Sequence, residues 1–68
     1  MVNVDLLRKK MSEMRMTKAD VAAKMGLSTR TLTRRFKDPD GLLVSEVRKL
    51  SEILDLSARE VDDIFFAK

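Results

Sequence analysis

Apolar residues recur along the chain at intervals of three and four, the spacing that is typical of amphipathic helices. The first stripe predicts a helix over residues 4–14 with Asn3 as its N-cap, and its apolar members are Val4, Leu7, Met11 and Met14. A second helix is expected over residues 18–25, where Thr17 caps the start and Asp20 follows in the first turn. Its inward residues are Val21, Ala22 and Met25.

Gly26 follows the second stripe at a position where helices often end in a left-handed residue, a conformation that glycine adopts at little cost. Ser28 then caps a third helix over residues 29–37, whose inward residues are Leu32 and Phe36. The segment of residues 38–41, Asp-Pro-Asp-Gly, is a strong turn signal because proline suits the second position of a turn.

Two more helices are expected in the second half of the chain. One begins near Ser45 with Glu46 in its first turn, and its inward residues are Val47, Leu50, Ile53 and Leu54. The other begins at a capping box of Ser57 and Glu60, runs to about Phe66, and buries Val61, Ile64 and Phe65. The pattern therefore predicts an all-α fold, with five short helices in a single compact domain over residues 1–68.

The charge of the chain is unevenly distributed. The formal net charge is +3, but residues 8–37 hold ten basic and two acidic side chains, a balance of +8. Residues 38–68 hold four basic and eight acidic side chains, a balance of −4. This polarity suggests one face directed to a polyanion, with an ordinary solvated helix surface as the alternative.

Composition excludes several classes of function. The chain has no Cys and no His, which excludes disulfides, thiolate or imidazole metal sites, and catalysis by either residue. No apolar run approaches the roughly 20 residues of a membrane span, and the N-terminus lacks a signal-peptide pattern. With no carboxylate pair in an evident cleft and little chain to enclose a substrate, we expect no enzyme, no cofactor and no small-molecule ligand.

The segment MTKADVAAKMGLS has the requirements of a helix-turn-helix, in which Ala22 allows two helices to cross closely and Gly26 allows the turn between them. It resembles the helix-turn-helix of the phage lambda repressor and Cro family over residues 16–36. The later segment LSEILDLSAREV is similar to the closing part of the same family, so the resemblance covers nearly the whole chain. It implies a homodimer on a two-fold symmetric double-stranded DNA operator, with the third helix in the major groove.

The same resemblance assigns roles to individual residues. The base-reading positions of the family fall on Thr29, Arg30, Thr33 and Arg34. Lys18 stands where the family usually has a glutamine that touches phosphate, and Thr17 and Ser28 match capping positions that approach phosphates. Exposed helix surface is the alternative reading for Arg30 and Arg34. For Lys18, and for Arg8, Lys9 and Lys10, phosphate contact and solvated charge are equally acceptable interpretations.

Three departures from the family pattern are visible. A frequent Arg–Glu pair between the first and third helices is replaced by Met11 and Phe36, a coherent exchange because packed apolar residues often substitute for a buried ion pair without loss. Arg35 occupies a usually apolar position, so either the local packing differs or Arg35 reaches a phosphate. Asp38 and Asp40 lie in a loop that is often basic, which argues against backbone contacts there.

The sequence therefore predicts a DNA-binding transcription regulator similar to a phage Cro protein or a short repressor, in the cytoplasm of a bacterial or phage-infected cell. One rival is the antitoxin of a toxin–antitoxin pair; another is a protein-interaction module that does not bind DNA. Phe66 lies outside the inward stripe of the last helix, and either forms a dimer contact or folds onto the edge of its own core.

Overall fold

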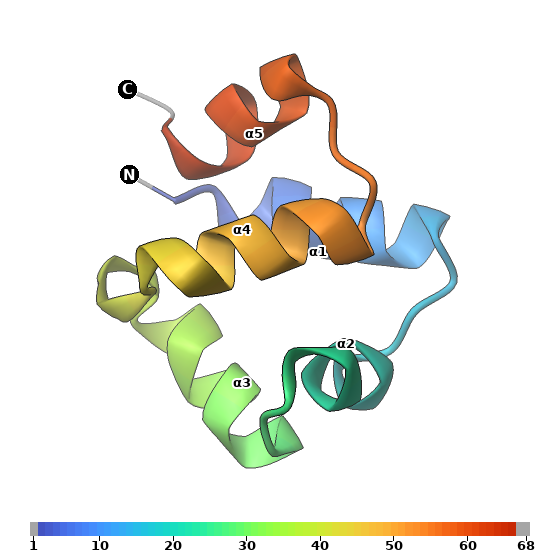
Figure 1. Cartoon of the computed structure of the whole chain (residues 1–68), viewed down its shortest axis with the longest axis vertical. Coiled ribbons are helices and arrows are strands. Elements are labelled where there is room, and N and C mark those ends of the chain that lie inside the picture. Colours follow the sequence, from blue (N-terminus) through green and yellow to red (C-terminus); the bar gives the residue numbers. More distant parts are fainter. Residues whose placement is uncertain (1, 67–68) are drawn as a thin grey trace.

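Two helices at the centre of the fold separate a single helix on one side from a helix pair on the other. In the computed structural model, which describes residues 2–66, α4 (Val44–Ile53) crosses the middle of the molecule with α1 (Val4–Glu13) behind it (Figure 1). Helix α5 (Ala58–Phe65) lies above them, and α2 (Lys18–Met25) and α3 (Thr29–Lys37) lie below. A 3-10 turn over Pro39–Gly41 links α3 to α4. The described residues therefore have the predicted all-α fold of five helices.

Short-range capping interactions define where most of the helices begin. The side chains of Asn3, Thr17, Ser28 and Ser57 each accept a hydrogen bond from the backbone amide three residues later, at 3.1 Å in every case. Each bond satisfies an amide that has no partner within its helix. The four predicted N-caps are confirmed, and all five helices start at or within one residue of the expected position.

The core lies where the central helices meet the helices above and below. Eleven apolar side chains are buried there, namely Leu7, Met11, Val21, Ala22, Met25, Leu32, Phe36, Leu50, Leu54, Ile64 and Phe65. Met11 and Phe36 are among them, as expected for apolar replacements of an ion pair. The predicted inward residues Val47, Ile53 and Val61 are half-buried and pack against this core.

One expectation for the end of a helix was wrong. Met14 was expected on the apolar stripe of the first helix, but it is 40% exposed. The reason is that α1 ends at Glu13, and Arg15 then takes a left-handed conformation with φ of 56°, which turns the chain away from the stripe. Helix α4 begins at Val44, next to the expected Ser45, and the Glu46 carboxylate caps it by accepting the Leu43 amide at 2.9 Å.

Candidate nucleic-acid interface

Gly26 forms the turn that sets α2 against α3. It has a left-handed conformation with φ of 74°, and the amide of the next residue, Leu27, donates to the Ala22 carbonyl at 2.9 Å. Ala22 itself is buried beside the turn, where the two helices pack together. The small residue at the crossing and the glycine in the turn are thus located as the sequence predicts.

Helix α3 has an apolar side and a solvent-facing side. Leu32 and Phe36 hold the apolar side in the core. The residues on the other side line a shallow hollow along the helix: Thr29, Arg30, Thr33, Arg34 and Lys37. The four base-reading positions assigned from sequence therefore lie together on one side. Lys37 joins them and was missed, although its spacing of four from Thr33 places it on the same helical face.

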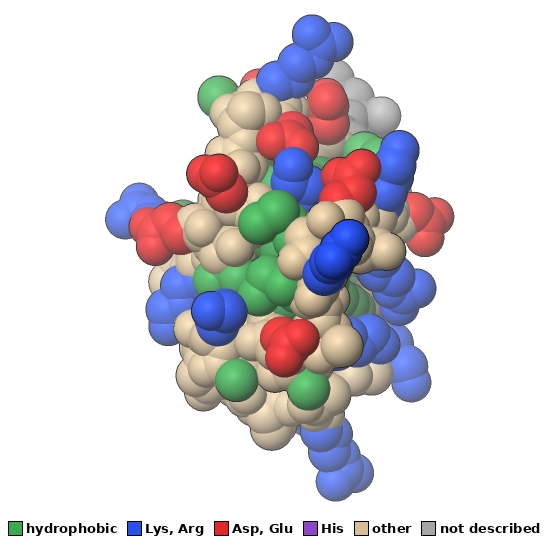
Figure 2. All heavy atoms as spheres, turned by 90° about the vertical axis from the view of Figure 1, so that its right-hand side faces the viewer, with side chains coloured by type: hydrophobic (Ala, Val, Ile, Leu, Met, Phe, Trp, Pro, Cys, Tyr) green, Lys and Arg blue, Asp and Glu red, His purple; other side chains and the backbone are tan. Residues whose placement is uncertain are grey.

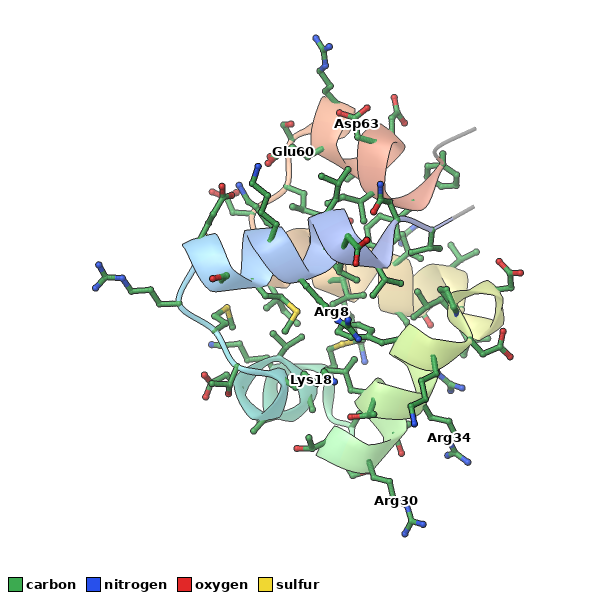
Figure 3. All side chains as sticks on the ribbon, turned by 180° about the vertical axis from the view of Figure 1, so that it is seen from behind. Arg8, Lys18, Arg30, Arg34, Glu60 and Asp63 are labelled. Carbon is green, nitrogen blue, oxygen red and sulfur yellow. The ribbon has the colours of Figure 1, made fainter. Side chains whose placement is uncertain are left out.

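Arg30 and Arg34 point away from the protein and have no acidic partner among residues 2–66. Figure 3 shows Arg30 and Arg34 extending outward from α3, whereas Glu60 and Asp63 lie on α5 at the opposite end of the molecule. The ion pairs found among residues 2–66 are Lys10–Glu60 and Arg35–Glu46, so neither arginine is neutralised by a carboxylate. Both guanidinium groups are thus free to interact with an anionic ligand.

The same separation of charge is visible on the surface. In Figure 2, most of the acidic side chains of the displayed face lie in its upper half, towards the α5 end, whereas basic side chains occur over the whole face and dominate its lower half. An anion that approaches the α2–α3 end therefore meets mostly basic side chains, whereas at the α5 end it meets the acidic ones as well. The charge imbalance between the two halves of the sequence therefore becomes a spatial polarity in the fold.

Arg35 differs from its neighbours on α3 because it is held by α4. Its Nε atom lies 3.1 Å from Oε1 and 3.2 Å from Oε2 of Glu46, a residue that is only 7% exposed. The same carboxylate accepts the Leu43 amide, so one acid both caps α4 and binds α3. Arg35 was grouped with the DNA-binding residues from sequence, but the structure separates it from the hollow of α3. The changed local packing is present, and a phosphate contact of Arg35 stays a prediction.

Lys18 lies at the start of α2, next to the Phe36 ring near the end of α3. Its Nζ atom is 5.9 Å from the centroid of the Phe36 ring, within the range of a cation–π interaction. This interaction directs the half-buried Lys18 side chain towards the side of α3. The Lys18 ammonium has no carboxylate partner among residues 2–66. The hydroxyls of Thr17 and Ser28 are already used as helix caps, which fixes Thr17 at the start of α2 and Ser28 at the start of α3, directly after the turn.

The comparison with protein families agrees with this geometry. A helix-turn-helix family model matches residues 7–61, which include the whole of α2 and α3. The chain belongs to the lambda-repressor-like helix-turn-helix family. This family consists of DNA-binding transcription regulators and is typically non-enzymatic, so DNA-binding regulation is the functional class of the chain. Comparisons with the curated proteins and with the solved structures find no match.

None of the helices in residues 2–66 has both the length and the apolar character that crossing a bilayer requires.

A second surface feature lies at the junction of the α3–α4 connection with the end of α5. Val44 and Phe66 are 78% and 64% exposed, and they border a groove whose other apolar members are Val2, Pro39, Leu42, Val47 and Phe65. Of the two interpretations of Phe66, this exposure favours a surface contact over a side chain that folds onto its own core edge. Phe66 instead leaves an apolar ring in solvent beside an apolar groove.

Proposed function

We propose that this chain is a sequence-specific transcription regulator, of the Cro or short-repressor kind, that docks α3 in the major groove of a symmetric operator. The observation that carries the proposal is the solvent-facing side of α3. There Arg30 and Arg34 extend next to Thr29 and Thr33 and have no acidic partner among the described residues. The major groove admits an α-helix, and its base edges offer acceptors that arginine can bind in pairs.

The position of each residue suggests its role. Arg30 is the second residue of α3, and the first turn of a recognition helix points most directly at the base edges. Its guanidinium matches the two major-groove acceptors of a guanine, while Thr29 and Thr33 can contact either bases or phosphates through short hydroxyls. Arg34 lies one turn further along the same side and is placed to reach a base or the adjacent backbone.

Residues at the starts of α2 and α3 would bind the DNA backbone. Lys18 carries a positive charge beside α3, and Thr17 and Ser28 lie at the first turns of α2 and α3. Helix N-termini offer free amides to anions, so these positions suit phosphate contacts that set the orientation of the protein on the duplex.

The groove beside Phe66 supports a homodimer as the DNA-bound form. An isologous interface needs a surface that is complementary to itself, and here a projecting ring and an apolar groove lie side by side. Val44 and Phe66 are only two exposed side chains, a small apolar surface beside the roughly 1,600 Å² that a standard stable interface buries. We therefore propose a weak dimer that becomes tighter when two half-sites hold the protomers together.

Selection of bound sequences from a pool of random duplexes tests the proposal. The wild-type protein should enrich a symmetric motif, and affinity for that motif should fall steeply as salt rises because bound phosphates release counterions. Arg30→Ala should relax preference at one base position in each half-site, a loss of about 1–3 kcal/mol of discrimination.

Lys18→Ala is the matched control, and it should weaken binding almost equally on all sequences. Failure to enrich any motif would contradict sequence-specific recognition. An unchanged motif with uniformly weaker binding by Arg30→Ala would make Arg30 a phosphate contact, and base reading would then rest on Thr29, Thr33 and Arg34.

A further inference from the structure

Three consecutive basic residues on α1 are divided between two sides of the molecule. Lys10 turns towards α5, where its Nζ atom lies 2.9 Å from Oε2 of Glu60. Lys9 lines a hollow together with Lys10 and the acids Glu60 and Asp63. The charges of Lys9 and Lys10 therefore face the acidic end of the protein, and the polyanion expected at α3 lies at the other end.

Arg8 lies on the opposite side of α1. Figure 3 shows its side chain descending from α1 towards α3, on the same face on which Lys18 starts α2. The residue is exposed, and no carboxylate of residues 2–66 forms an ion pair with it. Because successive helical residues are rotated by about 100°, the side of Arg8 is fixed once Leu7 and Met11 are buried in the core.

Arg8 and Lys18 are basic side chains that come from α1 and α2 on the side of the molecule seen in Figure 3, and we call this pair the cationic edge. Lys18 lies 5.9 Å from the Phe36 ring near the end of α3, and in this view Arg8 descends from α1 towards α3. A duplex whose major groove receives the outer side of α3 presents a phosphate backbone on each side of that helix. The edge formed by Arg8 and Lys18 is placed to face one of these backbones, and guanidinium is well suited to phosphate.

We infer that Arg8 is a phosphate contact, which extends the DNA interface from α2 and α3 onto α1. This inference rests on the proposed function, since it assigns an additional backbone contact to the same complex. It also divides the basic cluster of α1 by role: Arg8 binds DNA, whereas Lys9 and Lys10 do not.

The chain offers a closely matched control for this inference. Arg8→Ala and Lys9→Ala each remove one positive charge from adjacent exposed positions of the same helix, so they change net charge and helix propensity almost equally. Fluorescence anisotropy with a labelled duplex of mixed sequence, titrated at several salt concentrations, measures the number of phosphates that each variant neutralises. Circular dichroism should give an unchanged helical signal for both variants.

The expected result is a change in salt dependence for one variant alone. For Arg8→Ala, the slope of log affinity against log salt should fall by about 0.9, so that a rise from about 50 to 200 mM salt weakens it about 3.5-fold less than the wild type. Lys9→Ala should keep the wild-type slope. Arg8→Lys should also keep it, because a lysine ammonium neutralises a phosphate as a point charge.

Equal slopes for Arg8→Ala and Lys9→Ala would overturn the inference and leave the proposed function standing. The inference would also be overturned if the wild-type protein binds the duplex and Lys9→Ala, but not Arg8→Ala, reduces the slope of log affinity against log salt. In that case α1 would face DNA through its other side. If the wild-type protein binds neither this duplex nor any selected sequence, the proposed function and the inference fail together.

Discussion

Substitution of Gly26 separates the cost of a left-handed backbone from the cost of crowding. Gly26 has φ of 74°, and a Cβ atom placed on it would meet no heavy atom within 4 Å beyond its immediate neighbours. Gly26→Ala should therefore cost only the conformational penalty of a left-handed residue, about 1–2 kcal/mol. For a domain of this size, about 1 kcal/mol lowers the unfolding midpoint by about 4–8 °C.

Gly41→Ala provides the matched control, because it makes the same change in composition without the penalty of a left-handed backbone. It lies in the Pro39–Gly41 turn outside the left-handed region, and its nearest prospective contact is Oδ2 of Asp38 at an ordinary 3.9 Å. Gly41→Ala should be neutral or stabilise the fold by about 0.4–1 kcal/mol, since alanine reduces the entropy of the unfolded chain. Gly26→Asn should be less harmful than Gly26→Ala, because asparagine tolerates the left-handed region better.

Urea unfolding followed by circular dichroism measures these differences as free energies of unfolding. The reasoning is refuted if Gly26→Ala is as stable as Gly41→Ala, because the left-handed turn would then carry no cost. It is also refuted by a loss above about 3 kcal/mol, which would mean that the added methyl group meets an obstacle. Folded Gly26→Ala should bind DNA with wild-type affinity, since the turn residue itself reads no base.

Three further changes are expected to have measurable effects. Glu46→Ala should cost about 1–3 kcal/mol of unfolding free energy, because Arg35 and a backbone amide lose a common acceptor; a loss below about 0.5 kcal/mol would show that the buried carboxylate contributes little net stability. Phe66→Ala should weaken cooperative operator binding at an unchanged thermal midpoint, whereas a sharp drop in the midpoint would place this ring in the core. Backbone amides donate to Asp20 and Glu60 and lower the pKa of each carboxyl below its ordinary value of 3.8 or 4.5. These two carboxylates therefore stabilise the folded state fully above those values, and their contribution is lost as pH falls through the lower folded-state pKa values. Asp20→Asn combined with Glu60→Gln should flatten the acid limb of a midpoint-against-pH curve, and an unchanged limb would contradict this assignment.

The interactions that the sequence determines by itself are short in range. Each N-cap bonds to an amide three residues away, and Gly26 ends α2 through its own freedom of φ, so both signals are complete within one helical turn. The apolar spacing likewise places Leu32 and Phe36 on one side of α3, which leaves Arg30 and Arg34 on the other. The helix-turn-helix and its outward arginines were therefore predictable without a fold.

Only the tertiary structure determines which partners distant charges find. Arg35 and Glu46 are eleven residues apart, and nothing local to either residue indicates that the packing of α3 near α4 will bring them together. The same holds for Lys10, which reaches Glu60 only because α1 packs against α5. In sequence, Arg8, Lys9 and Lys10 are three equivalent charges. In the fold they differ because α1 lies between an acidic helix on one side and the recognition helix on the other, and the packing of the helices decides which charge faces which surface.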